Sequence, residues 1–338
     1  MIRVAVNGYG VIGRRTADAV AAQSDMKLAG IVKTKPDYKA RLALEKGYSI
    51  YASDNQSFDT FRGAGMNVSG VARDLIKESD IIVDACPDGV GARNKTTYEE
   101  LGRKAVFQGG EEHRVADFSF VAQCNFDQAI GRKYVRVVSC NTTGLCRVLH
   151  ALDRAFGVKR ARVVLARRAA DPEESSKGPI DAVVLDPITV PSHHGEDVMT
   201  VLPHVEVISM AFKVPTTHMH LHSLIVSLKD SEASEGRVEE VIGDTTRVLL
   251  IEGKEGFRST SSVMDYAREL KRGRSDLFES VVWRDSIKML DGELYMFMGV
   301  HQEAIVVPEN VDAIRALAGG YTSSESIALT NSSLGILK

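Results

Sequence analysis

The chain has 338 residues, of which 44% are hydrophobic and 26% charged, and its formal net charge is −3. These values predict a soluble globular protein of about two domains, and the small charge gives no reason to expect nucleic acid or an anionic membrane as partner. No apolar run approaches the ~20 residues of a membrane helix. The four cysteines form no CxxC pair, so we expect free thiols in a reducing compartment. Because the chain opens directly on a predicted strand, we expect no signal peptide and a cytoplasmic protein.

A dinucleotide fingerprint opens the chain. Residues 2–7 form a β-branched run that predicts a strand, and residues 11–22 have helical spacing. Between them, Gly8 permits a tight turn, Gly10 lets the backbone approach a pyrophosphate and Gly13 lets the helix pack close to the strand. Free N–H groups at the start of the helix would face the phosphates. This context favours dinucleotide binding over a glycine turn without a ligand.

The end of the second predicted strand, residues 26–32, indicates which dinucleotide is bound. An NAD-specific site places Asp or Glu there to hold the ribose 2′-hydroxyl. This chain has Lys33, Thr34 and Lys35 instead, and a cation beside a hydroxyl suits a 2′-phosphate. We therefore predict NADP as the preferred cofactor and NAD as the second. The alternative is a solvated basic turn.

Short strands continue to alternate with helices along the first part of the chain. We predict helices over residues 36–46 and 91–102, and strands over residues 80–85 and 104–108. This alternation indicates an α/β fold with a parallel, doubly wound sheet, which is a Rossmann domain. Ligands of such sheets lie beyond the carboxyl ends of the strands.

A cysteine stands where the last strand of this domain should end. Residues 134–138 predict a buried strand, and the apolar spacing of residues 145–152 is helical. Cys140 should therefore lie at a strand-to-helix junction, with Thr142 or Thr143 as the N-cap. The helix macrodipole should lower the thiol pKa from about 8.5 toward neutral. Its expected place at the same sheet edge as the glycine turn favours a nucleophile sharing the cofactor crevice over a small buried apolar residue, the usual role of cysteine.

The pattern changes to long strands after Gly157. We predict three of them, over residues 160–169, 205–214 and 218–228. A loop-rich stretch over residues 171–203 joins the first two, and a C-terminal helix is expected over residues 309–318. This pattern indicates a second domain of α+β type, built on a mostly antiparallel sheet.

His218, His220 and His222 alternate along the third long strand, so their imidazoles should point to one face. Three interpretations are open: ligands of Zn²⁺, a general base that activates Cys140, or a polar strand face with a structural role. No carboxylate lies close in sequence to complete a metal site, and we predict no metal.

Cations and imidazoles also follow the first long strand. Arg167 and Arg168 end that strand, and His193 and His194 are expected in a loop. Such groups commonly hold a phosphoester. The alternative is a solvated surface.

Five segments carry a family resemblance. They are NGYGVIGRR (7–15), SCNTTGLCR (139–147), PSHHG (191–195), PTTHMH (215–220) and HQE (301–303). Together they resemble the archaeal-type phosphorylating glyceraldehyde-3-phosphate dehydrogenases, from the first residues to about Asn310. The bacterial and eukaryotic branch is less similar, because it has a different cysteine context and an acidic residue where this chain has Lys33 and Thr34.

The resemblance implies a homotetramer of three-part chains. These parts are a nucleotide-binding domain over residues 1–139, a catalytic domain over residues 140–302, and a C-terminal segment over residues 303–338 whose helix returns to the first domain.

The resemblance also implies roles for individual residues. Cys140 is the implied nucleophile and His220 the implied base, with His218 as the alternative base because the family often has an apolar residue there. The implied substrate contacts are Ser139, Asn141, Thr142, His193 and His194, with Arg167 a further candidate for an anion site. The cofactor contacts are Val11, Ile12, Gly110, Arg168 and Gln302, beside Gly8, Gly10, Gly13, Lys33 and Thr34.

The implied reaction is the oxidation of glyceraldehyde 3-phosphate with inorganic phosphate to 1,3-bisphosphoglycerate, a step of glycolysis and gluconeogenesis. Two alternatives are open. One is a semialdehyde dehydrogenase, whose site would want an arginine for a carboxylate rather than paired histidines. The other is a nucleotide-binding redox sensor without turnover.

Overall fold

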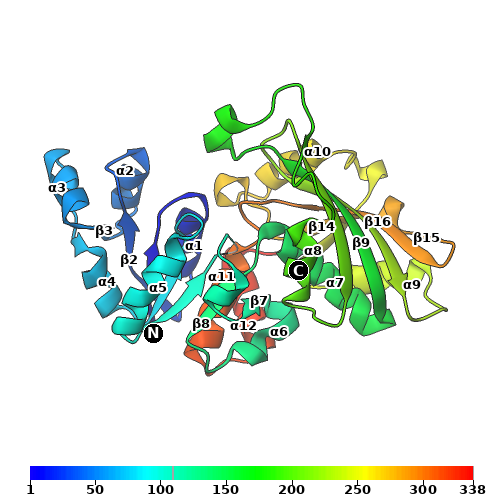
Figure 1. Cartoon of the computed structure of the whole chain (residues 1–338), viewed down its shortest axis with the longest axis horizontal. Coiled ribbons are helices and arrows are strands. Elements are labelled where there is room, and N and C mark those ends of the chain that lie inside the picture. Colours follow the sequence, from blue (N-terminus) through cyan, green and yellow to red (C-terminus); the bar gives the residue numbers. More distant parts are fainter. Residues whose placement is uncertain (109, 338) are drawn as a thin grey trace. The chain divides into compact units, whose positions relative to one another are not determined.

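A computed structural model describes residues 1–108 and 110–337, and the chain divides into two compact units, each with its own sheet (Figure 1). Unit 1 comprises residues 1–139 and 307–334, and unit 2 comprises residues 140–306 with the last residues from Gly335. None of the helices in the described ranges combines the length and the apolar character of a membrane span.

Unit 1 is built on a parallel sheet of eight strands. The strands are β1 (Ile2–Asn7), β2 (Met26–Lys33), β3 (Ile50–Ala52), β4 (Gly70–Val71), β5 (Ile81–Asp84), β6 (Lys104–Phe107), β7 (Ser119–Phe120) and β8 (Tyr134–Val137). Their order is β4-β3-β2-β1-β5-β6-β8-β7, and every neighbouring pair is parallel. The strand order reverses between β1 and β5, which is the switch point where doubly wound sheets bind ligands. The prediction of a Rossmann sheet is confirmed.

Helices cover the sheet of unit 1. They are α1 (Val11–Ala21), α2 (Tyr38–Glu45), α3 (Asn55–Gly63), α4 (Ala72–Glu78), α5 (Val90–Glu100), α6 (Ala122–Ala129), α11 (Val307–Ala318) and α12 (Ser323–Leu334), with a 3₁₀ turn at His113–Val115. Leu75 and Ile76 of α4 and Tyr98 of α5 share one core cluster with β1, β2, β5 and β6. The predicted C-terminal helix is present as α11, and it contacts β5, β6 and β8 as well as α1, α6 and α12.

Unit 2 is built on a second sheet of eight strands. They are β9 (Val158–Arg168), β10 (Val184–Leu185), β11 (Glu206–Val214), β12 (His220–Leu228), β13 (Val248–Ile251), β14 (Ser280–Trp283), β15 (Lys288–Leu290) and β16 (Glu293–Val300). The order is β10-β11-β9-β12-β16-β14-β13, with β15 paired to β16.

The second sheet is mixed rather than mostly antiparallel, which corrects the prediction. β9 pairs with β11 in parallel, and so does β13 with β14. Parallel neighbours need a crossover connection, usually helical. The connection between β9 and β11 contains α8 (His193–Met199), and the one between β13 and β14 contains α10 (Thr260–Glu269). Both helices lie in stretches where no helix was predicted.

Two further helices belong to unit 2, and the longer one packs on its sheet. They are α7 (Cys140–Phe156) and α9 (Glu235–Asp244), with 3₁₀ turns at Pro172–Lys177, Gly253–Glu255, Gly273–Ser275 and Arg284–Ser286. α7 packs directly on β16, because a Cβ on Gly144 would clash with Val300 Cγ1 and lie 3.1 Å from Met298 Cε. Only glycine permits this approach.

A buried ion pair anchors the last residues of the chain to unit 2. Arg272 donates from both terminal nitrogens to the Glu279 carboxylate, each at 2.7 Å, and to Gly335 O at 2.6 Å. The Leu337 N–H donates to Glu279 Oε1 at 2.8 Å. Burial opposes the charge on Glu279, but the Arg272 hydrogen bonds outweigh it and lower the pKa of Glu279.

We expect Arg272→Met to lower the free energy of unfolding by about 3–5 kcal/mol, because it leaves a buried carboxylate without its partner. Since the folded pKa of Glu279 lies below its unfolded value of about 4.3, the pair stabilises the fold above that pH, and the contribution is lost as pH falls through the folded pKa. Urea unfolding at pH 7 and pH 3.5 measures both effects. Equal stability of the variant and the native chain at pH 7 would contradict the account, and Arg272→Met/Glu279→Leu should recover part of the loss.

Candidate active site

The glycine turn after β1 is shaped for close approach by a ligand. Gly8 has φ +99°, and a Cβ there would lie 2.7 Å from the Ala85 carbonyl oxygen. A Cβ on Gly13 would clash with the Gly8 carbonyl, so α1 is held against the turn. Around Gly10 a Cβ would meet nothing within 4 Å, and no side chain caps α1. The free N–H groups at this helix start therefore fit a dinucleotide pyrophosphate. The half-buried Val11 and Ile12 begin the helix.

A buried network ties the ends of β1 and β5 together beneath this turn. The Tyr98 hydroxyl donates to Asp84 Oδ2 at 2.6 Å and accepts from Asn7 Nδ2 at 2.8 Å. The Cys86 N–H donates to Asp84 Oδ1 at 3.1 Å. Burial, with the Asp84 charge, raises the pKa of Cys86, so this thiol is protonated and inert.

Lys33 ends β2 beside a carboxylate that the sequence analysis missed. Its Nζ donates to Asp37 Oδ2 at 2.7 Å. Asp37 also caps α2, accepting from the N–H groups of Lys39 and Ala40. Burial opposes its charge, but the Lys33 hydrogen bond and the two N–H groups lower the pKa of Asp37. The expected ribose site therefore holds a cation and an anion, with Thr34 exposed beside them.

Cys140 is the first residue of α7, and β8 ends at Val137, so the predicted strand-to-helix junction is present. The predicted N-cap was wrong, because Thr142 and Thr143 are buried inside the first turn. The Thr142 hydroxyl instead donates to Asp197 Oδ2 at 2.5 Å, which joins α7 to α8.

The expectation of a lowered thiol pKa was also wrong. Cys140 is partly exposed as a residue, yet burial of the thiol raises its pKa. The guanidinium groups of Arg167 and Arg168 and the Asn141 N–H pull the pKa down without offsetting the burial. The macrodipole of one helix is too weak to reverse the desolvation of a thiolate.

We expect the rate of Cys140 alkylation by iodoacetamide to rise steadily from pH 7 to pH 9, about tenfold per unit well below the pKa, because the reactive thiolate is the minor form there. A pH series of inactivation rates on the chain without dinucleotide measures this. A plateau below pH 7 would show a preformed thiolate and contradict it.

The predicted row of three histidines is shortened to two. β12 begins at His220, and Met219 has φ +63°, which breaks the alternation before His218. Gln302 holds this bend, because its Oε1 accepts from the Met219 N–H at 2.8 Å and its Nε2 donates to Thr217 O at 2.9 Å. His218 therefore lies outside the strand face. A cofactor contact of Gln302 stays a prediction.

His220 is fully buried, and one of its two ring nitrogens accepts a hydrogen bond. Nδ1 accepts the Arg168 N–H at 2.9 Å, so the neutral ring carries its proton on Nε2. Burial, with the neighbouring His222 and Arg167, holds the pKa of His220 well below its usual range.

His222 also belongs to the site, although the sequence analysis named it only as one of three candidate histidines. Its Nε2 lies 2.9 Å from Asn141 Oδ1, on the residue after the cysteine. The rings of His220 and His222 stack with centroids 6.5 Å apart. Burial, with Arg167, lowers the pKa of His222 to about 3. The period-two spacing of the histidines pointed to His222 in the sequence, but it could not show that Asn141 is its hydrogen-bond partner.

His193 and His194 begin helix α8 instead of lying in a loop. A Cβ on Gly195 would clash with the Val207 carbonyl, and the Gly195 N–H donates to Ser209 Oγ at 2.8 Å, so the helix start is fixed on β11. The two imidazoles stack at 4.0 Å. His194 is buried and His193 exposed. Burial, with His193 and Arg167, lowers the pKa of His194 to about 2.

Arg167 carries the positive charge that acts on Cys140 and on the buried imidazoles of His194, His220 and His222. It pairs with Asp186, which also lies 3.4 Å from Lys213 Nζ. Its buried Nε has no hydrogen-bond partner among the residues that the structure describes. Its positive charge disfavours protonation of the imidazoles of His194, His220 and His222 and favours the Cys140 thiolate.

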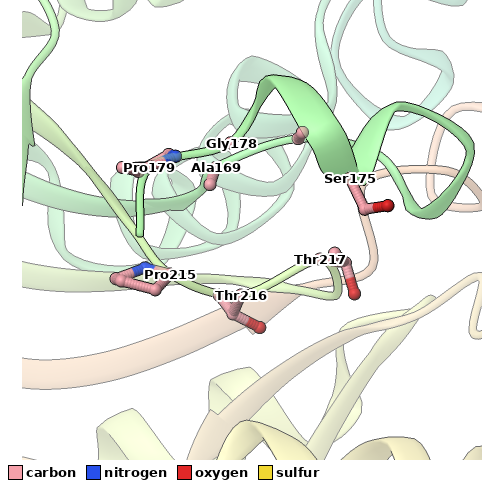
Figure 2. A pocket seen from close by; sticks show the side chains of 8 residues that line it. Ala169, Ser175, Gly178, Pro179, Pro215, Thr216 and Thr217 are labelled. Carbon is pink, nitrogen blue, oxygen red and sulfur yellow. The ribbon is translucent and has the colours of Figure 1, made fainter. Parts of the chain in front are cut away.

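A cavity of about 320 Å³ opens between the end of β9 and the segment before β12. Figure 2 shows Ser175 on the short 3₁₀ turn, with Thr216 and Thr217 on the segment that leads to β12. The complete lining is Ala169, Ala170, Ser175, Gly178, Pro179, Pro215, Thr216 and Thr217. Within the described ranges, no group of three or more His, Cys, Asp or Glu side chains is arranged to hold a metal ion.

Comparison with known proteins shows the family to which the chain belongs. Residues 139–286 match the family "Glyceraldehyde 3-phosphate dehydrogenase, C-terminal domain". A glyceraldehyde-3-phosphate dehydrogenase of Methanothermobacter thermautotrophicus is 52% identical over 339 residues, covering 100% of both chains. The chain belongs to the glyceraldehyde-3-phosphate dehydrogenase family.

Further glyceraldehyde-3-phosphate dehydrogenases agree. The protein of that name from Methanoregula boonei is 50% identical and covers 99% of this chain and 97% of its own. The one from Methanobacterium formicicum is 50% identical, with 100% of both chains covered. Among solved structures, aspartate semialdehyde dehydrogenase II of Vibrio cholerae superposes with a TM-score of 0.70 at 11% identity, over 95% of this chain and 99% of that one. That likeness shows a shared fold.

The expected site residues of this glyceraldehyde-3-phosphate dehydrogenase family member divide between the two units. Unit 2 holds Cys140, Asn141, Thr142, Arg167, Arg168, His193, His194, His220 and Gln302. Unit 1 holds Gly8, Gly10, Val11, Ile12, Gly13, Lys33, Thr34, Gly110 and Ser139. The structure joins Asn141 to an imidazole and Thr142 to α8, which begins with His193 and His194.

Proposed function

We propose that the protein oxidises D-glyceraldehyde 3-phosphate with inorganic phosphate to 1,3-bisphosphoglycerate, and catalyses the reverse. The observation that carries the proposal is the Cys140 cluster, with its arginines and buried imidazoles, in a chain 52% identical over its full length to a glyceraldehyde-3-phosphate dehydrogenase. We place the reaction in cytoplasmic glycolysis and gluconeogenesis.

Cys140 is the proposed nucleophile. After its thiol loses a proton, the sulfur attacks the aldehyde carbon, and the carbonyl oxygen becomes the oxygen of a hemithioacetal. Loss of a hydride from that carbon leaves a thioester. Inorganic phosphate then attacks the thioester carbonyl and breaks the C–S bond, which releases the acyl phosphate and restores the thiolate. A bound nicotinamide dinucleotide supplies the acceptor for the hydride.

His220 is the proposed base, and its hydrogen bond sets a condition on that role. While Nδ1 accepts the Arg168 N–H, the Nε2 of the neutral ring is a donor. To take the thiol proton, the ring must release the Arg168 bond or pass its Nε2 proton onward. The resting pair is therefore a neutral thiol and a neutral imidazole, consistent with the raised pKa of Cys140 and the lowered pKa of His220. His218 is the alternative base.

The substrate phosphate and the attacking phosphate need two anion sites. The proposed groups are Thr142, Arg167, His193 and His194, and Ser139 and Asn141 are proposed as further substrate contacts. Arg167 offers a buried Nε that no described residue occupies. The two histidines bring stacked rings at the start of α8. Neutral imidazoles donate hydrogen bonds to phosphate, so the lowered pKa of His194 is compatible with this role.

NADP is the proposed preferred cofactor, with NAD second. Lys33 supports a 2′-phosphate, while Asp37 supports a 2′-hydroxyl. The glycine turn, Gly110, Arg168 and Gln302 complete the proposed contacts.

We expect Asp37→Asn to raise the preference for NADP over NAD several-fold, because it removes a negative charge beside Lys33. Asparagine caps a helix as well as aspartate, so α2 should keep its stability. The ratio of kcat/KM for the two dinucleotides measures the effect. An unchanged ratio would show that this pair lies away from the ribose.

Unit 1 is proposed as the nucleotide-binding domain, and the catalytic domain is proposed over residues 140–302. A homotetramer is proposed from the family resemblance. An interface is supported by the face of the second sheet opposite α7, which exposes apolar side chains, among them Ile208, Met210 and Phe297. The segment before α8 exposes more, with Ile188 80% accessible. Apolar surface of this extent on a folded chain commonly marks a protein interface. Light scattering of the purified chain tests the assembly.

Neither alternative function is favoured. A semialdehyde dehydrogenase shares the fold at only 11% identity, whereas 52% identity links the chain to a glyceraldehyde-3-phosphate dehydrogenase. The deciding experiment is the absorbance of NADPH after glyceraldehyde 3-phosphate is added, with and without inorganic phosphate. A phosphate-dependent rise supports the proposal. Oxidation of aspartate semialdehyde instead, or no turnover of either aldehyde, would overturn it.

A further inference from the structure

We propose that His222 is a positioning residue, which holds the Asn141 amide so that its NH₂ group is directed to the oxygen of the reacting carbonyl. The inference rests on the proposed function, because it assigns Asn141 a contact with the hemithioacetal oxygen. It names a residue beyond the nucleophile and the base.

The strand pairing of unit 2 brings His222 into contact with Asn141. In the pairing of β12 with β16, His222 lies opposite Met298 and His220 opposite Val300. Gly144 of α7 packs on those same two partners, so the start of α7 lies over this face. Asn141, one turn before Gly144, thereby meets His222, and the two side chains are 2% and 0% exposed.

The polarity of the contact determines the amide orientation. Asn141 Oδ1 can only accept, so His222 Nε2, at 2.9 Å, must carry the proton and donate. With Oδ1 held by the ring, the two N–H groups of Asn141 remain to donate elsewhere. With the other tautomer, a rotated amide would donate from Nδ2 to a bare Nε2 and turn Oδ1 toward any developing negative charge. The arrangement in the structure, with Oδ1 facing His222 Nε2, is the one that can stabilise an oxyanion.

The rest of the strand indicates that this histidine serves more than packing. The buried positions of β12 continue beyond His222 as Leu224, Val226 and Leu228. A leucine at residue 222 would continue this series. Instead, the buried Nδ1 of His222 has no hydrogen-bond partner among residues 1–108 and 110–337. An unsatisfied buried acceptor costs stability, so the Nε2–H contact is its evident use.

The test compares a donor with an apolar side chain at residue 222. We expect His222→Leu to lower kcat about 10²-fold, as for loss of one oxyanion donor, with KM for glyceraldehyde 3-phosphate within threefold and the alkylation rate of Cys140 unchanged. His222→Gln retains an N–H and should recover at least tenfold of that loss. Leu224→Val, on the same buried face, is the matched control and should keep kcat. If glutamine is no better than leucine, or if only KM changes, the proposal fails.

A double-mutant cycle separates positioning from independent catalysis. Because His222 acts through Asn141, adding His222→Leu to Asn141→Ala should cost no further activity, whereas independent roles would multiply. Multiplying losses would overturn the proposal.

The tautomer of His222 gives a measurement that needs no stable variant. In ¹⁵N NMR of the native chain, we expect a protonated Nε2 and a bare Nδ1 at pH 7, and a protonated Nδ1 would refute the inference. Failure of the native chain to oxidise glyceraldehyde 3-phosphate would overturn the proposed function and the contact of Asn141 with the substrate oxygen. The tautomer tests the His222–Asn141 contact separately, because that contact does not depend on the substrate.

Discussion

Replacing Cys140 with serine is expected to lower kcat by at least about 10⁴-fold, the scale seen when a catalytic nucleophile is removed. A serine hydroxyl has no accessible anion near neutral pH, and the imidazole proposed to activate it has a pKa well below its usual range. NADP affinity should stay unchanged, because Cys140 is not among the proposed cofactor contacts and the glycine turn belongs to unit 1. Steady-state rates and a fluorescence titration of NADPH measure the two expectations.

The matched control is Cys146→Ser on the same helix. Cys146 is fully buried and is assigned no chemistry, so its replacement should change kcat by only a few-fold. Full activity in Cys140→Ser would contradict the account. So would a loss in Cys146→Ser as large as that in Cys140→Ser while the helix remains folded.

Replacing His220 with alanine is expected to lower kcat by about 10²–10⁴-fold, the usual contribution of a general base. The rate of Cys140 alkylation near neutral pH should also fall, because the thiol loses the group proposed to accept its proton. The two rates should fall together, which a loss of substrate binding alone would not produce. Stopped-flow alkylation and steady-state kinetics on the same preparation measure them.

His218→Ala is the control for this assignment. His218 lies before the strand and outside the face that carries His220 and His222, so its removal should leave alkylation within a few-fold. If His218→Ala slows alkylation and His220→Ala does not, the base is misassigned.

Features that depend on local backbone geometry were predictable from the sequence. The needs of the turn at Gly8, Gly10 and Gly13 are met within one strand–turn–helix unit, and the structure shows each glycine in its expected place. The junction at Cys140 was predictable because an apolar run ends and helical spacing begins within a few residues.

Features that depend on distant parts of the chain were not predictable. The pKa of Cys140 depends on burial in the folded unit, and the position of His218 on a bend that Gln302 holds from 83 residues away. The carboxylates of Asp37 and Asp197 were not predicted, because their importance shows only in the contacts that they make with Lys33 and Thr142 in the folded chain.

The same limit explains why the mixed second sheet and the helices α8 and α12 were not predicted. α8 lies in a stretch rich in Pro, Asp and Ser, and its start is fixed by Ser209 of β11, so the parallel pairing of β9 with β11 was hidden. α12 is a serine-rich helix held by tertiary contacts. Arg315 of α11 donates to Thr330 Oγ1 at 2.7 Å and to Ser326 O at 3.2 Å.

The central claim is that Cys140 carries the acyl group between oxidation and phosphorylation. The most direct measurement is a single turnover with glyceraldehyde 3-phosphate and NADP in the absence of inorganic phosphate, followed by acid quench and mass spectrometry of the peptide that contains Cys140. The account predicts a burst of NADPH stoichiometric with active sites, a thioester adduct on Cys140, and loss of the adduct when phosphate is added. A burst with the adduct on another residue, or NADPH formation without any covalent adduct, would contradict it.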